Sequence, residues 1–78
     1  MAKSTHSREY DDFRHLLRVV REEVDVTQVE LATRLGWTQT MVSKAELGER
    51  RLDLVETTWW CDALGISIER FVERWVRA

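Results

Sequence analysis

Proline is absent from this sequence, and glycine occurs only three times in 78 residues. Because both residues interrupt helices, their scarcity favours helices joined by short turns. The chain has a single cysteine, Cys61, which excludes an internal disulfide. One cysteine and two histidines are too few ligands for a zinc site. We therefore expect an all-α fold with no metal and no other cofactor, in which Cys61 is a small buried apolar residue rather than a redox sensor.

Long apolar segments are absent as well. No run approaches the length that spans a bilayer, and the polar N-terminus has no apolar stretch of the kind found in signal peptides. We expect a cytoplasmic protein without membrane contact. The sequence shows no nucleophile with a base and no phosphate-cradling glycine loop, so we expect neither an enzyme nor a small-molecule ligand.

An excess of positive charge is missing too. The formal net charge is −2, which by itself does not suggest a partner that is a polyanion. Residues 27–52 are the least acidic part of the chain, whereas acidic residues outnumber basic ones over residues 53–78. A chain of this length forms one domain with a small core, and dimerisation would add stability.

Hydrophobic spacing and capping signals predict five helices. Apolar residues three and four positions apart, from Phe13 to Val24, predict one helix over residues 9–24 in which these residues form a buried stripe. Thr27 and Asp53 each precede a glutamate by three residues, a capping box that predicts helices from 28 to about 35 and from 54 to 64. Thr38 and Ser67 are predicted caps of helices from 39 to about 47 and from 68 onward. We divide the chain into a mobile arm, residues 1–8, and a single domain, residues 9–78.

The segment from the second to the third predicted helix has small and apolar residues at fixed positions. Ala32 is small where two helices would cross, and Gly36 suits a tight turn between them. Val42 and Ala45 would hold the later helix against the earlier one. This spacing is typical of a helix-turn-helix.

In these residues the sequence resembles the Cro and phage-repressor family of helix-turn-helix proteins, also called the xenobiotic-response-element (XRE) type. The resemblance extends over roughly residues 14–72 and includes Thr27-Gln28, Leu31-Ala32, Leu35-Gly36, Ser43-Lys44 and Ala63-Leu64-Gly65. It implies a lambda-repressor-like bundle of five helices, the second and third forming the helix-turn-helix, with the third helix in the major groove of double-stranded DNA.

The third predicted helix has one apolar and one polar face. Met41, Val42 and Ala45 lie on one side, and Gln39, Thr40, Ser43, Lys44 and Leu47 lie on the other. We predict that Gln39, Thr40 and Lys44 read bases. Gln can pair with adenine, Thr can meet a thymine methyl group, and Lys suits the guanine acceptors.

Two further sets of residues depend on the resemblance. It implies that Gln28 contacts a phosphate, and the positions around the third helix add further phosphate candidates: Thr38, Ser43, Arg50 and Arg51. It also implies a structural ion pair between Arg21 and Glu46. In the N-terminal arm, Lys3 and Arg8 could reach DNA, although we favour a disordered tail there.

Three positions depart from the family pattern. Asp25 stands where glycine is usual, which is tolerable because Asp visits the left-handed region more readily than most residues. Trp37 replaces a smaller residue in the turn and is expected to join the core. Leu47 replaces a polar residue, which leaves only backbone N–H groups for a phosphate contact there.

The four tryptophans need an explanation in so short a chain. On the fourth predicted helix, Leu54, Trp60, Cys61 and Leu64 suit an inward face, whereas Trp59 stands where the family usually has a polar residue. The fifth helix supplies more apolar surface than one small domain can cover, which is typical of an interface. We predict a homodimer interface formed by Ile68, Val72, Trp75, Val76 and Trp59. A monomer with inward tryptophans and a site for a different protein are the alternatives.

The resulting interpretation is a sequence-specific, double-stranded DNA-binding transcription regulator, with repression favoured, that acts as a homodimer on a palindromic operator. The alternative is an antitoxin or other protein-interaction adaptor that holds a protein such as a toxin through its tryptophan-rich surface. The sequence does not separate phage repressors, restriction-modification controllers and antitoxins.

Overall fold

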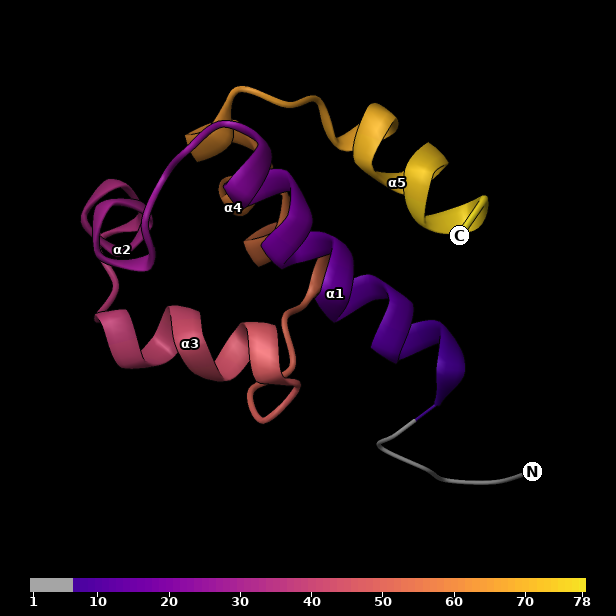
Figure 1. The fold of residues 1–78 in the computed structure, drawn as a ribbon, viewed down its shortest axis with the longest axis horizontal. Helices are drawn as coiled ribbons and strands as arrows, with labels where there is room; N and C mark the ends of the chain where they lie inside the picture. The colour runs from indigo at the N-terminus through magenta and orange to yellow at the C-terminus, as the bar shows by residue number, and fades with distance from the viewer. Residues whose placement is uncertain (1–6) are drawn as a thin grey trace.

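The computed structural model describes residues 7–78 and confirms the all-α fold with five helices; no strand occurs in this part of the chain. The helices are α1 (Arg8–Glu23), α2 (Gln28–Leu35), α3 (Gln39–Leu47), α4 (Leu54–Leu64) and α5 (Ile68–Val76). Figure 1 shows α1 through the middle of the molecule, with α2 and α3 at one end and α5 at the other.

The predicted helix starts are present. Thr27 and Asp53 form complete capping boxes with their glutamates, and Thr38 and Ser67 accept backbone N–H groups of α3 and α5. A further cap was not predicted: the Ser7 hydroxyl accepts from the backbone N–H of Tyr10 at 3.1 Å, so α1 begins at Arg8. Residues 7 and 8, which were predicted to belong to the mobile arm, are therefore the cap and the first residue of α1. Residues 1–6 of that predicted arm lie outside the described part of the chain.

The core lies between α1, α2 and α4 and is closed by α3 on one side and α5 on the other. Its largest fully buried side chains are those of Trp60, Phe71, Leu17, Leu31, Val42 and Cys61. Trp60 brings its polar edge inside, and its Nε1–H donates to the carbonyl oxygen of Leu17 at 3.2 Å. A buried aromatic ring with a satisfied N–H stabilises a small domain strongly, and its loss would cost about 3–5 kcal/mol.

Polar contacts hold α5 against α1. Arg74 donates two hydrogen bonds to the Glu23 carboxylate, at 2.8 and 2.7 Å, and these bonds hold the pKa of Glu23 below its usual value. Trp75 donates from Nε1 to the carbonyl oxygen of Glu9 at 2.9 Å, and its ring packs edge-on against Phe13. The position of α5 is therefore set by this chain's own contacts.

Two residues expected to face inward are exposed. Val24, the C-cap of α1, is 48% exposed, and Leu54, the first residue of α4, is 69% exposed. Both lie at a helix end, where the apolar spacing continues beyond the turns that pack against a neighbour. Trp37 is half-buried against the core, with its ring edge-on to Trp60, and Asp25 adopts the expected left-handed backbone with φ of 57°. Within the described residues, no helix is both long and apolar enough to cross a membrane.

Candidate nucleic-acid interface

Helix α3 packs on α1 and α2 with one side and presents the other to solvent. Val42, Ala45 and Glu46 are buried beneath it. Gln39, Thr40, Lys44 and Leu47 are exposed and Ser43 is half-exposed, so the structure brings the three predicted base-reading residues to one solvent-facing side. The side chain of Leu47 is 59% exposed in the last turn of this helix.

The turn between α2 and α3 determines how this helix is presented. Gly36 ends α2 in the left-handed conformation with φ of 71°, which directs the chain sharply into Trp37 and Thr38. The Thr38 hydroxyl accepts from the backbone N–H of Met41 at 3.2 Å and so caps α3. The Thr38 hydroxyl, which was predicted to contact a phosphate, therefore accepts a hydrogen bond as the N-cap of α3.

A chain of side-chain hydrogen bonds connects the exposed start of α3 to the core. Gln39 donates from Nε2 to Oε1 of Gln28 at 2.7 Å, and Gln28 donates from Nε2 to Oε1 of Glu46 at 2.9 Å. Gln28 is thus oriented by a buried carboxylate on one side and orients Gln39 on the other. The sequence predicted only a phosphate contact for Gln28, and neither of these two hydrogen bonds was predicted.

Arg21 and Glu46 anchor this chain of bonds. Arg21 donates from Nε and Nη2 to the two carboxylate oxygens of Glu46, at 2.6 and 3.0 Å, and from Nη1 to the carbonyl oxygen of Val26 at 2.8 Å. Both side chains are buried, and the hydrogen bonds to Glu46 raise the pKa of Arg21 above its usual value. This fork-to-carboxylate geometry fixes α3 relative to α1 and to the turn before α2.

The two arginines after α3 have different surroundings. Arg50 donates from Nη2 to Glu56 at 2.8 Å, and its guanidinium lies 4.9 Å from the centre of the Trp37 ring. The backbone N–H of Asp53, which has the larger effect, and the hydrogen bond from Arg50 keep the pKa of Glu56 below its usual value. A phosphate contact by Arg50 would have to share or replace these contacts. Arg51 is exposed and lies 4.0 Å from the centre of the Tyr10 ring.

The predicted dimer surface is only partly continuous. Val72 and Val76 are exposed on α5, and Ile68 and Trp75 are half-buried beside them. A groove of about 350 Å³ runs between α1, the start of α4 and α5. Its lining includes Tyr10, Phe13, Leu54, Ile68, Val72 and Trp75.

Trp59 lies elsewhere. Its side chain is 51% exposed, as expected, but it lines a separate hollow with Arg34, Leu35, Asp62 and Ala63, between α2 and α4. The residues of α4 that line the α5 groove are Leu54 and Thr57, both near the start of the helix. From the sequence, Leu54 was expected to face inward, which the structure contradicts, and Trp59 was expected to join α5 in a dimer interface.

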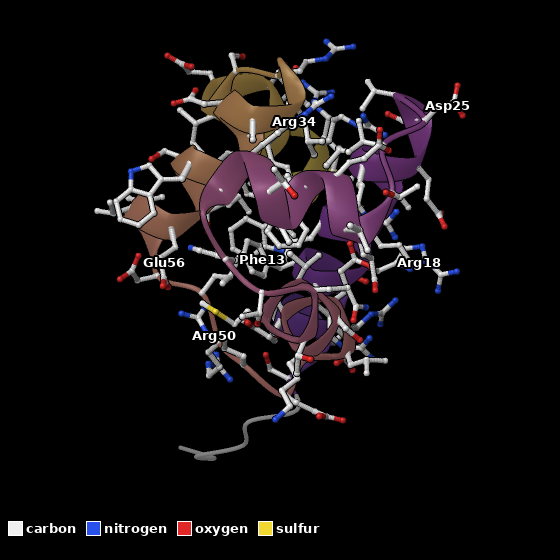
Figure 2. All side chains as sticks on the ribbon, turned by 90° about the vertical axis from the view of Figure 1, so that its left-hand side faces the viewer. Phe13, Arg18, Asp25, Arg34, Arg50 and Glu56 are labelled. Atoms are coloured by element: carbon white, nitrogen blue, oxygen red, sulfur yellow. The ribbon has the colours of Figure 1, made fainter. Side chains whose placement is uncertain are left out.

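A third surface feature was not predicted from the sequence. A polar hollow of about 280 Å³ lies between α1, the start of α2 and α3, and its lining includes Arg14, His15 and Arg18. The signal was available, since Arg14, Arg18 and Arg21 follow one another at intervals of four and three residues and share a helix face. In Figure 2, α3 is seen nearly end-on, with Arg18 on one side of the molecule and Arg50 on the other.

Comparison with known proteins gives a family and several similar folds. The family described as "Helix-turn-helix domain" matches residues 12–73. An XRE-family like protein from Pseudomonas syringae pv. tomato is 36% identical, with a TM-score of 0.83 over 88% of this chain and 84% of its own. No curated protein sequence matched this chain.

Two more distant structures have the same fold. The restriction-modification controller protein C.Esp1396I, a tetramer in complex with its natural 35-base-pair operator, is 22% identical with a TM-score of 0.84 over 92% of this chain and 95% of its own. The clp gene regulator ClgR from C. glutamicum is 22% identical with a TM-score of 0.81 over 91% of each chain. From the extent of the family match and the identity to the Pseudomonas protein, this chain belongs to the Cro/XRE-type helix-turn-helix family.

Proposed function

We propose that this protein is a sequence-specific, double-stranded DNA-binding transcription regulator. The observation that carries the proposal is the two-sided character of α3, whose polar side chains Gln39, Thr40 and Lys44 face solvent while Val42 and Ala45 anchor the other side in the core. A single helix with one accessible polar side fits the major groove of B-DNA. The operator-bound controller protein and the gene regulator ClgR, both similar in fold, support this assignment.

The three exposed side chains have distinct chemistry toward base edges. The Gln39 amide can pair with N6 and N7 of adenine, and Lys44 can donate to O6 and N7 of guanine. Thr40 can contact a thymine methyl group or donate one hydrogen bond. Gln39 has the least freedom of the three, because its bond to Gln28 restricts the directions in which its amide can point.

We further propose that the protein acts as a homodimer through the groove between α1, α4 and α5. Exposed Leu54 and Val72 border this groove, together with half-buried Ile68 and Trp75. In Figure 1, α5 and α3 lie toward opposite ends of the molecule, so that a dimer formed through α5 could still place both third helices on DNA. Two such helices would read half-sites about one helical turn, ~34 Å, apart. Occupation of an operator would exclude RNA polymerase, and the protein would act as a repressor.

Selection of binding sequences from a random duplex pool, with the bound complexes sized, tests the DNA assignment. We expect a two-fold symmetric consensus with half-sites about one turn apart. Lys44→Ala should lose preference at one base pair of each half-site, at a cost of about 1–3 kcal/mol per half-site. A pool without enrichment would refute sequence-specific binding, and an unchanged preference in Lys44→Ala would refute the assigned reading face.

Sedimentation of two matched variants tests the interface. Leu54→Glu places a charge in the α5 groove, whereas Val55→Glu places the same charge on the neighbouring residue, which is 56% exposed and does not line the groove. Both positions are open to solvent, so the fold should persist in each variant. We expect Leu54→Glu to be a monomer and Val55→Glu to remain a dimer. A dimer in both variants would remove this groove from the interface.

A second candidate function, an adaptor or antitoxin that holds another protein, is favoured by one observation. Trp59 is 51% exposed in a hollow distinct from the α5 groove, and exposed tryptophans are enriched at binding hot spots. Copurification of a second polypeptide from the natural host, lost in Trp59→Ala, would support this function. A protein that purifies alone and selects an operator would contradict it.

A further inference from the structure

The polar hollow between α1, α2 and α3 is built around one carboxylate that is already satisfied. Its lining contains Arg14, Arg18, Arg21 and the carboxylate of Glu46. Arg21 and Gln28 together donate three hydrogen bonds to the Glu46 carboxylate. The charges of Arg21 and Glu46 cancel, so the bottom of the hollow is neutral. The cations that remain are Arg14 and Arg18, with His15 beside them, and the hollow therefore presents net positive charge.

Each of the two arginines has an acidic neighbour on α1, but neither acid lines the hollow. Arg14 pairs with Asp11 at 3.2 Å, and both of these residues are half-buried. Arg18 pairs with Glu22 at 3.1 Å, and both of these side chains are exposed to solvent. The Arg18 side chain is 60% exposed and that of Glu22 is 51% exposed. An ion pair so open to water is weak and exchanges its partner readily. Arg18 can therefore turn from Glu22 to an anion in the hollow.

The position of the hollow relative to α3 indicates which anion it meets. Ser43 and Leu47 belong to the solvent-facing side of α3 and also line the hollow, so the hollow adjoins the proposed base-reading face along its edge. A duplex with α3 in its major groove carries a phosphate backbone along each edge of that groove. Gln28, which orients Gln39, stands at the same boundary.

We propose that this hollow binds one phosphate of the DNA backbone, with Arg18 as its main cation and the Ser43 hydroxyl as a further donor. The inference rests on the proposed DNA-binding function and adds a contact from α1 to it. It shares Ser43 with the phosphate set predicted around α3, but its main cation is Arg18 rather than Arg50, which is engaged by Glu56 and Trp37. Arg14 has a second duty, because it donates from Nη1 to the Glu46 carbonyl oxygen and packs against Gly48.

Variants of Arg18 test the proposal without disturbing the core. Binding to the selected operator and to an unrelated duplex is measured by fluorescence anisotropy at several salt concentrations. For Arg18→Ala we expect weaker binding to both duplexes, an unchanged sequence preference, and a slope of log affinity against log salt that is smaller by about one per protomer. Arg70→Ala is the matched control, since Arg70 is an exposed α5 arginine that also pairs with a glutamate of its own helix. It should bind like wild type.

Glu22→Gln supplies the opposite change. Removing the carboxylate that holds Arg18 should strengthen binding to both duplexes, an outcome that loss of a structural contact would not give. A neutral methylphosphonate placed at single positions of the operator then locates the phosphate. At the contacted position it should weaken wild type and leave Arg18→Ala unaffected.

The outcomes separate the two levels of the argument. A wild-type protein that binds no duplex overturns the proposed function and this inference together. A wild-type protein that binds DNA while Arg18→Ala keeps the full salt slope overturns the inference alone. Loss of sequence preference in Arg18→Ala would also overturn it, because a backbone contact carries no base information.

Discussion

Removal of the Arg21 guanidinium should be among the most damaging single changes to this domain. Arg21→Ala deletes two of the three hydrogen bonds to Glu46 and the one hydrogen bond to the carbonyl oxygen of Val26. The Glu46 carboxylate, on a residue that is 6% exposed, is then left with Gln28 alone. A buried charge that loses its partner costs about 3–5 kcal/mol. Domains of this size are stable by about 4–12 kcal/mol, so the variant should be largely or wholly destabilised.

Urea unfolding followed by tryptophan fluorescence at one protein concentration measures this loss. Arg70→Ala, which breaks an exposed pair, should change the free energy of unfolding by less than about 0.5 kcal/mol. The double variant Arg21→Met, Glu46→Leu should be more stable than Arg21→Ala, because it leaves no unpaired buried charge. An Arg21→Ala protein within about 1 kcal/mol of wild type would refute the argument, and so would a double variant that is the least stable of the series.

Three further predictions concern the turn after α3, the cap of α4 and the core. Gly48→Ala should lose about 1–3 kcal/mol more stability in urea unfolding than Gly36→Ala. Both glycines have positive φ, but only at Gly48 would a new Cβ lie 2.6 Å from Arg14 Cδ. Equal losses in the two variants would show that Arg14 moves aside at no cost. The folded-state pKa of Glu56 lies below its ordinary value of 4.5, so its contribution to stability is present above about pH 4.5 and is lost as the pH falls through the folded-state pKa. The difference in urea midpoint between wild type and Glu56→Gln should therefore shrink below pH 4.5, and a constant difference would contradict this. Burial raises the pKa of Cys61 to about 11, so a thiol reagent at pH 8 should modify it only after unfolding; rapid modification of the folded protein would show that the core opens locally.

The helices and their starts could be predicted from the sequence because their signals are local. Thr27 and Asp53 are recognisable from a glutamate three residues later, and the apolar spacing from Phe13 to Val20 needs only one helix. Exposure was mistaken at Val24 and Leu54, where the apolar spacing runs to a helix end that no neighbour covers. Local spacing identifies a helix face but does not say where its partner helix stops.

Polar side-chain contacts between helices could be predicted only where the family pattern supplied them. The pairing of Arg21 with Glu46 came from the resemblance, whereas the bond from Gln28 to the same carboxylate depends on the angle between α2 and α3. Likewise, no spacing rule places the Arg50 guanidinium over Trp37. Side chains as long as arginine and glutamine have several partners within reach, and the tertiary arrangement selects among them.

The bond between Gln39 and Gln28 limits how binding preference could change during evolution. A substitution at residue 39 would remove the donor that now bonds to Oε1 of Gln28. A second substitution, at residue 28, would then be needed to restore a hydrogen bond between α2 and α3. Lys44 is exposed, and within residues 7–78 its side chain makes no hydrogen bond or ion pair, so it can be exchanged alone. Paralogues that diverge in target sequence should therefore vary first at residue 44 and should change residues 28 and 39 together.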